Sequence, residues 1–169
     1  IDCNGRASLN ICSVGIDARI GTDVHKYSAL PLVGGAAGYI TSLVVNLVKG
    51  IRSPFRVKCG KQLFEGELSL VCACNGRYYG GGFMPVPQAR MDDGVLHAMV
   101  VKKISHVKFL QFVGAYSKGE YRKFPDIASC TEPKVVRITS DKPDIVTCMD
   151  GECLAYDDVT IRLSDKRLN

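Results

Sequence analysis

The residues of this chain that could do chemistry are glycines and carboxylates in three short segments. The first segment contains Gly80, Gly81 and Gly82 between two aromatic residues. Successive glycines let the backbone take up conformations closed to other residues and let another group approach closely, so this segment could cradle a phosphate. It lacks the Lys-Ser/Thr of a P-loop and matches no dinucleotide fingerprint. Taken alone, a bulged connection between strands is the simpler interpretation.

The other two segments are pairs of acids beside a glycine. Asp92 and Asp93 precede a glycine and could supply oxygen ligands to a hard cation, or could form an Asp-Gly turn, and the two interpretations are compatible. Asp150 and Glu152 flank Gly151 after an apolar run. A carboxylate held at a strand end can act as a general base or bind a phosphate-bound metal. The alternative is a solvated hairpin turn.

The elements that must position these residues are mostly short strands. Apolar alternation predicts a long hairpin, and helical spacing of apolar residues predicts two helices, the second with Ser105 as its N-cap. The expected strands cover residues 8–16, 55–59, 63–74, 96–101, 134–139, 145–149 and 159–163, and the expected helices cover 36–49 and 105–116. The fold class is therefore mainly β with helical insertions (α+β), an antiparallel β-sandwich in a single domain over residues 1–169.

Composition limits the remaining possibilities. Hydrophobic residues make up 46% of the 169 residues, which is enough for a substantial core, and the net charge is +5. The basic residues are scattered, so nucleic acid is not an expected partner. The eight cysteines fall largely in apolar runs, which favours buried thiols in a reducing cytoplasm over a disulfide framework. No apolar run reaches the roughly 20 residues of a membrane span.

Taken in order, the motifs resemble those of one family, the diacylglycerol kinase-like lipid kinases, which include bacterial lipid kinases and sphingosine kinases. Residues 10–18 have the pattern Asn-x-x-Ser-x-Gly-x-Asp-Ala, and a Tyr-bearing segment follows at residues 38–40. Residues 75–89 have an Asn-Gly, Gly-Gly-Gly and Pro-x-Ala series, residues 92–96 read Asp-Asp-Gly-x-Leu, and residues 150–152 read Asp-Gly-Glu. Each motif is short, but the order and spacing of all of them cover nearly the whole chain.

The resemblance implies a two-domain enzyme of which this chain is the C-terminal, substrate-side β-sandwich. The nucleotide-binding domain with its Gly-Gly-Asp-Gly-Thr motif is absent from the sequence, so this fragment is expected to be inactive alone. The implied reaction transfers phosphate from ATP, with Mg²⁺, to a hydroxyl of a diacylglycerol-like or sphingoid lipid. Asp150 would be the base or a magnesium-network acid with Glu152 beside it, and Asp92 or Asp93 would bind a structural magnesium. Gly80, Gly81 and Gly82 would line the interdomain cleft.

The partners implied are a lipid at the membrane surface and the nucleotide-binding domain. A cytoplasmic location, peripheral to the inner face of the membrane, follows from this substrate class. A severed domain could also form a homodimer through its exposed interdomain face. The alternative from another class is a non-catalytic β-sandwich that binds lipid or protein and carries its acids only in turns.

Overall fold

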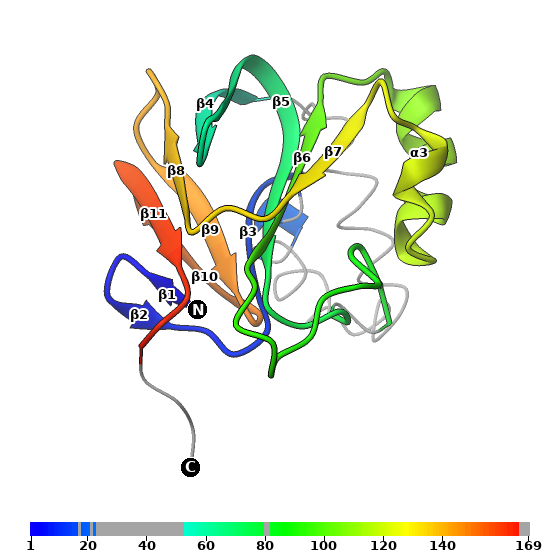
Figure 1. The fold of residues 1–169 in the computed structure, drawn as a ribbon. Helices are drawn as coiled ribbons and strands as arrows, with labels where there is room; N and C mark the ends of the chain where they lie inside the picture. Colours follow the sequence, from blue (N-terminus) through cyan, green and yellow to red (C-terminus); the bar gives the residue numbers. More distant parts are fainter. Residues whose placement is uncertain (17, 21, 23–52, 80–81, 166–169) are drawn as a thin grey trace, which may run out of the picture.

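One strongly curled antiparallel sheet dominates the computed structural model, which describes residues 1–16, 18–20, 22, 53–79 and 82–165 (Figure 1). The sheet has 11 strands. They are β1 (Asp2–Cys3), β2 (Arg6–Ala7), β3 (Ile11–Gly15), β4 (Ser53–Cys59), β5 (Gln62–Cys74), β6 (His97–Lys102), β7 (Ala128–Thr131), β8 (Val135–Thr139), β9 (Ile145–Met149), β10 (Glu152–Tyr156) and β11 (Asp158–Arg162). Two helices lie entirely within the described residues: α3 (His106–Ser117) and the short 3-10 helix η1 (Tyr121–Lys123).

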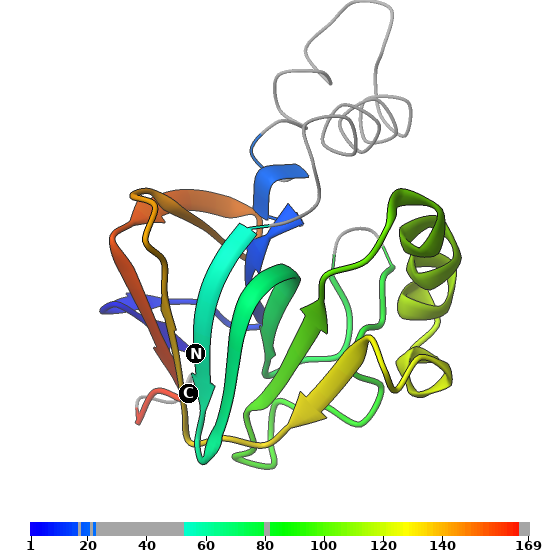
Figure 2. The ribbon, with the colours of Figure 1, turned by 90° about the horizontal axis from the view of Figure 1, so that it is seen from above.

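The long strand β5 organises the sheet. The strand order is β10-β9-β3-β5-β4-β8-β11-β1-β2, with β6 and β7 attached to β5 off this path. The first half of β5 pairs with β4, and its second half pairs with β3 and β6. The sheet therefore divides into two arms, which curl toward each other until β9 approaches β11 (Figure 2). This curl gives the half-barrel form of a sandwich and confirms the predicted mainly β fold.

Strand β5 is buried on both faces in its second half, from Leu68 to Cys74. Its pairing with β6 is irregular between Leu68 and Leu70, where Ser69 is an extra residue, as in a β-bulge. Leu68 consequently packs on one face of the sheet and Leu70 on the other. In a regular strand these two leucines would share one face, and the additional residue of the bulge separates them.

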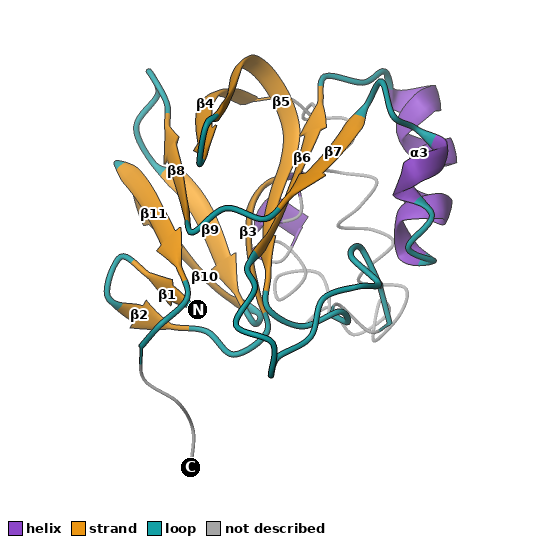
Figure 3. Cartoon of the chain, in the orientation of Figure 1, coloured by secondary structure: helices purple, strands orange, loops and turns teal. Residues whose placement is uncertain are grey.

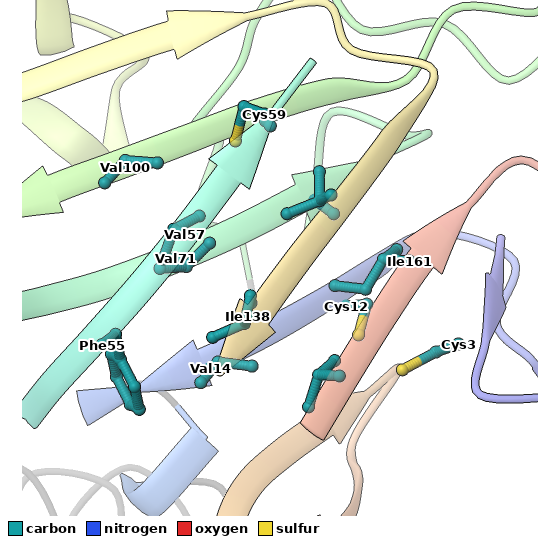
Figure 4. Close-up of a cluster of buried hydrophobic side chains, with 14 of the residues drawn as sticks. Cys3, Cys12, Val14, Phe55, Val57, Cys59, Val71, Val100, Ile138 and Ile161 are labelled. Carbon is teal, nitrogen blue, oxygen red and sulfur yellow. The ribbon is translucent and has the colours of Figure 1, made fainter. Parts of the chain in front are cut away.

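One face of the sheet encloses a closed apolar centre, which we call the inner core. Figure 4 shows its side chains converging between the two arms, including Val14, Val57, Val71 and Ile138. Their exposed fractions are between 0% and 1%. Its members are mainly aliphatic residues and cysteines from strands of both arms. Burying such side chains stabilises a fold by about 1.5–3 kcal/mol each, so the inner core explains why the sheet curls.

The opposite face of β3, β5, β6 and β7 is covered by α3 (Figures 1 and 3). We call this second set of buried residues the α3 cluster. Phe109, Phe112 and Tyr116 of the helix belong to it. Ser105 caps the helix as predicted, since its side chain accepts a hydrogen bond from the Lys108 N–H at 3.3 Å. Gly119 follows the end of the helix with φ +75°, which also agrees with the sequence.

Most predicted strands are present within one to three residues of their expected bounds. The hairpin of β4 and β5, strand β6 and strands β8, β9 and β11 are confirmed. Strands β1, β2, β7 and β10 were not predicted, because they are short or follow turns whose partners are distant in sequence. The predicted helix over residues 36–49 lies outside the described residues. Among the described helices, none has the length and apolarity of a membrane span.

Candidate functional site

Three of the sequence motifs meet at one end of the sheet. Asn10 precedes β3, Asn75 follows β5, and Asp150 follows β9. Strand β3 runs antiparallel to both β5 and β9, so its beginning lies beside the ends of the other two. Residues that are 65 or more positions apart in the sequence are thereby placed together. We call Asn10, Asn75, Gly76 and Asp150 the motif cluster.

Asp150 joins the β9–β10 turn to the beginning of β3. Asp150 and Gly151 have φ values of +49° and +99°, which are those of a two-residue type I′ turn. The Asp150 carboxylate accepts hydrogen bonds from the backbone N–H groups of Leu9 at 2.6 Å, Asn10 at 3.2 Å and Ile11 at 2.9 Å. Its own N–H donates to the Ile11 carbonyl at 3.1 Å. The hairpin interpretation of this segment is confirmed, and its acid also fixes a neighbouring strand.

Glu152 is the more available acid of the same turn. It is the first residue of β10, is exposed, and pairs across the hairpin with Met149. Its carboxylate makes no hydrogen bond or ion pair with any residue in the described part of the chain. The structure therefore leaves Glu152 able to meet a cation or a ligand, whereas Asp150 is already occupied by backbone donors. The catalytic roles of both acids stay predictions.

Asn10 and Gly76 are in close contact within the motif cluster. The Asn10 side-chain amide donates to the backbone carbonyl of Tyr78. The backbone carbonyl of Asn10 accepts hydrogen bonds from the backbone N–H groups of Asn75 and Gly76 at 2.9 and 3.1 Å. A Cβ atom on Gly76 would come within 1.9 Å of Oδ1 of Asn10. The Asn-Gly motif is thus required by the asparagine of another motif. The Asn75 side chain completes the arrangement by donating to the Leu9 carbonyl at 2.8 Å.

Asp92, one of the two predicted magnesium ligands, lines an open hollow beside the motif cluster, which Asn10 and Arg77 also line. Arg90 donates two hydrogen bonds of 3.1 Å to the carboxylate of Asp92. This hydrogen bonding, together with the positive charge of Arg90, holds the pKa of Asp92 below its usual value. Asp93 accepts a hydrogen bond from the Val95 N–H at 2.9 Å, which is the predicted Asp-Gly turn. Asp93 therefore has the freer carboxylate, and Mg²⁺ held there would keep most of its ligands as water.

The two residues that border the glycine segment, Tyr79 and Phe83, contact each other directly. These two residues form a β-bridge, and the N–H of Gly82 donates to the Tyr79 carbonyl at 3.1 Å. Gly82 has φ +122°, a conformation that glycine adopts readily. Gly80 and Gly81 lie outside the described residues. The bulged strand connection inferred from the sequence is thus supported at Gly82, and the cofactor-binding role of all three glycines stays a prediction.

The segment at Gly82 leads to an apolar pocket between α3 and the sheet. Tyr79 and Phe83 form one of its walls, and the helix residues Phe109, Phe112 and Tyr116 form another. The Tyr79 and Tyr116 hydroxyls are 2.8 Å apart, so the two walls are bridged by a hydrogen bond. The remaining lining residues are Ile16, Ile20, Ser69, Leu70, Val101 and Val113.

The pocket was not predicted from the sequence. The apolar face of α3 was visible as helical spacing, but that spacing is equally typical of a helix packed on a filled core. The aromatic residues Tyr79 and Phe83 flank the glycine run, but this pattern does not show which helix they face. Only the fold places Tyr79 opposite Tyr116.

Cysteines and histidines do not form a metal site in the part of the chain that the structure describes. No group of three or more His, Cys, Asp or Glu side chains there could hold a metal ion. All eight cysteines are free thiols, and six of them are buried. Cys72 and Cys74 share one strand face in the α3 cluster, as the spacing of two predicted. These cysteines serve as small apolar side chains.

The chain thus forms a curled β-sandwich with an apolar pocket under α3 and a cluster of sequence motifs at one end of the sheet. Comparison with known proteins identifies the family. Residues 10–169 match the family described as YegS C-terminal NAD kinase beta sandwich-like domain. The chain belongs to this family.

Relatives with assigned names agree with this. A Pseudomonas aeruginosa protein named "Probable lipid kinase YegS-like" is 30% identical over 104 residues, which is 59% of this chain and 32% of that protein. A Mycobacterium tuberculosis protein named "Diacylglycerol kinase" is 29% identical over 119 residues, covering 70% of this chain and 38% of that protein. The region of similarity is therefore well under half of either relative.

Two solved structures from Bacillus anthracis str. Sterne share the fold. One superposes with a TM-score of 0.66 at 23% identity and covers 94% of this chain and 50% of that chain. The other, a diacylglycerol kinase, has a TM-score of 0.55 at 19% identity and covers 94% and 47%. The chain thus spans about half the length of these kinase structures.

Proposed function

We propose that this chain is the lipid-side half of an ATP-dependent kinase that phosphorylates a hydroxyl of a diacylglycerol-like or sphingoid lipid. The observation that carries the proposal is the apolar pocket under α3, in a domain whose family relatives are named lipid kinases. Its apolar walls with few polar groups suit an acyl or sphingoid chain, but its volume is only about 30 Å³, so a chain could enter only if α3 moved away from the sheet. Tyr78 connects pocket and motif cluster, since its carbonyl is bonded to Asn10 and the next residue lines the pocket.

Phosphoryl transfer to a lipid hydroxyl needs positioning, neutralisation of phosphate charge and an acceptor for the hydroxyl proton. Asp150 and Glu152 are our candidates for the acids on the phosphate side. Asp150 lies at the beginning of β3, whereas Ile16 of the pocket follows the other end of that strand. Asp150 therefore suits a network around the metal and phosphate, with Glu152 as the acid that faces outward. Mg²⁺ bound with ATP would supply charge neutralisation, and Asp93 could hold a structural Mg²⁺.

The nucleotide-binding domain is the partner proposed for the motif end of the sheet. Three large apolar side chains are exposed around the motif cluster, namely Leu9, Tyr78 and Met91, at 55%, 54% and 57%. A lone exposed apolar residue is ordinary, but three beside one hollow are typical of an interface. A domain docked here would cover them and complete a cleft lined by Gly80, Gly81 and Gly82. In the isolated chain this surface is open, so we expect no kinase activity from it and a tendency to self-associate.

The outer face of α3 is proposed to meet an anionic membrane, the source of the lipid. Val107 and Leu110 are 70% and 58% exposed on this helix. The stretch 102–123 contains six basic residues and one acidic residue, an excess of five that equals the net charge of the whole chain. Lys108 lies on α3 itself, and the other five basic residues flank the helix, with Lys103 and Lys123 paired to Glu67 and Glu120. Exposed apolar residues with basic residues nearby are features of interfacial helices. A location at the inner face of the membrane is therefore part of the proposal, and this surface is the feature that supports it.

Vesicle sedimentation tests the membrane contact. We expect the full-length protein to bind vesicles that contain phosphatidylserine, to release them in high salt, and to bind less after Leu110→Glu. The matched control is Leu63→Glu, since Leu63 is 55% exposed on β5, outside the α3 surface. Equal loss in both variants would contradict a specific role for α3.

Lipid phosphorylation tests the function itself. The full-length protein should transfer phosphate from ATP to at least one of diacylglycerol, ceramide and sphingosine. We expect Asp150→Asn and Glu152→Gln to lower kcat by about 100-fold, as is typical when a positioned acid is lost. The control is Asp141→Asn, which removes an exposed acid in the turn before β9.

The outcomes of that assay separate the two classes of function. Lipid binding without transfer to any lipid would favour a non-catalytic binding module. If phosphate transfer is undiminished in both variants, Asp150 and Glu152 have no catalytic role and serve only in the β9–β10 turn.

A further inference from the structure

The pocket under α3 contains one polar side chain whose bonding is incomplete. Ser69 is 1% exposed and lines the pocket. Its hydroxyl has no hydrogen-bond partner among the described residues. Most buried hydroxyls are hydrogen-bonded, because leaving one unpaired costs about 1–3 kcal/mol. An unpaired hydroxyl at the wall of an otherwise apolar pocket calls for an explanation.

The position of Ser69 is produced by the β-bulge in β5. The pairing of β5 with β6 shifts between Leu68 and Leu70, which makes Ser69 the additional residue. Bulges commonly redirect a side chain next to a functional site. A regular strand would have continued the alternation of apolar residues at this point.

Gly15 makes room for the bulge. It has φ +104°, and a Cβ atom built on it would lie 2.7 Å from the Ser69 carbonyl oxygen. Gly15 is the glycine of the Asn-x-x-Ser-x-Gly motif, so the motif and the bulge depend on one another. The next residue, Ile16, lines the same pocket.

We propose that the Ser69 hydroxyl binds an oxygen of the lipid's polar backbone, an ester, amide or hydroxyl oxygen, and so selects amphipathic lipids over plain hydrocarbon chains. The inference rests on the proposed use of this pocket for lipid. In the empty pocket the hydroxyl is unpaired, and a bound lipid would complete its bonding while the apolar walls hold the chain. Among the described lining residues the other hydroxyls are those of Tyr79 and Tyr116, which are bonded to each other.

Binding selectivity tests the proposal. The probes are dodecanol and dodecane, measured by displacement of a fluorescent apolar dye from the chain, because they share a chain and differ by one oxygen. We expect Ser69→Ala to weaken dodecanol binding by about two- to ten-fold, the range for one hydrogen bond, and to leave dodecane unchanged. Ser69→Thr retains the hydroxyl and should keep part of the preference.

Stability provides a second, independent readout. Ser69→Ala removes an unpaired buried hydroxyl and should leave the Tm unchanged or raise it. The matched control is Ser8→Ala, because the Ser8 hydroxyl is also buried but donates to the Ile11 carbonyl at 3.2 Å. That control should lower the Tm and leave the dodecanol-to-dodecane preference intact.

Distinct results would overturn the two claims. An unchanged preference for dodecanol in Ser69→Ala, or an equal loss for both probes, would overturn the role of Ser69. If the preference falls as expected but the full-length protein phosphorylates no lipid, the binding role stands and the kinase proposal fails.

Discussion

The inner core and the α3 cluster lie on opposite faces of the same strand, β5, yet they are built differently. The inner core is closed, mainly aliphatic, and enclosed by the two arms of the sheet. The α3 cluster is rich in aromatic residues, is covered by one helix, and contains a pocket with an unpaired hydroxyl. Both faces contribute buried apolar residues to the fold, but the face under α3 also contains the pocket that we propose for a lipid.

The largest effect that would test this division is the loss of a side chain from the inner core. Ile138→Ala should lower the free energy of unfolding by about 2–5 kcal/mol, because it removes a fully buried side chain and leaves a cavity. Urea unfolding measures this change. The protein that remains folded should bind dodecanol as tightly as the wild type. Weaker binding of dodecanol at unchanged stability would contradict the separation of the inner core from the pocket.

The next effect concerns the glycine that links the two faces. Gly15→Ala should cost about 2–3 kcal/mol, since it combines an unfavourable backbone conformation with a clash against the Ser69 carbonyl. Gly66→Ala is a close control, because Gly66 has φ +105° but open space around its Cβ position. It should cost only about 1–2 kcal/mol. Only Gly15→Ala should also weaken dodecanol binding, and equal effects of the two variants would contradict the role assigned to the bulge.

A smaller loss of stability is expected at the motif cluster. Asp150→Ala should lower the free energy of unfolding by about 1–2 kcal/mol, since it removes the acceptor of three backbone N–H groups, partly replaced by water at this exposed site. Glu152→Gln should leave the unfolding free energy unchanged in the same urea titration. A large loss from Glu152→Gln would show that this acid has a structural partner and is not free for a ligand.

The smallest expected effect is a difference in thiol labelling between the two faces. Burial raises the pKa of both Cys59, in the inner core, and Cys130, which packs against the α3 cluster, to about 11. Below pH 11 the two thiols therefore have the same small thiolate fraction, and both should label about tenfold faster per added pH unit. Iodoacetamide should modify Cys130 several-fold faster, because the α3 cluster is less enclosed. Peptide mass spectrometry would measure the two rates, and faster labelling of Cys59 would contradict the difference in enclosure.

The sequence was sufficient for local features of the fold. The β4–β5 hairpin, the cap at Ser105 and the Asp150–Gly151 turn follow from alternation, capping chemistry and turn chemistry, which act within a few residues. The bulge at Ser69 could not be predicted, since it depends on the close approach of Gly15 from another strand. The short strand β10 was not predicted either, because it is defined by its pairing with β9.

The candidate site was predictable as a set of residues but not as an arrangement. The motifs at Asn10, Asn75 and Asp150 were each visible, and only the antiparallel registry of β3 with β5 and β9 brings them together. That registry also showed the Asp150 carboxylate bonded to backbone donors, a contact over about 140 positions that no local pattern encodes. The pocket under α3 depends on packing between a helix and a sheet, so it too required the fold.

The most direct test of the account is equilibrium binding of a pyrene-labelled diacylglycerol, presented in detergent micelles, to this chain. Val113→Trp fills the pocket from the inner side of α3, and Val107→Trp places the same residue on the outer side, where Val107 is 70% exposed. We expect saturable binding that Val113→Trp weakens by at least about ten-fold and Val107→Trp does not weaken. Absence of saturable binding, or equal binding by both variants, would contradict the claim that this pocket holds the lipid.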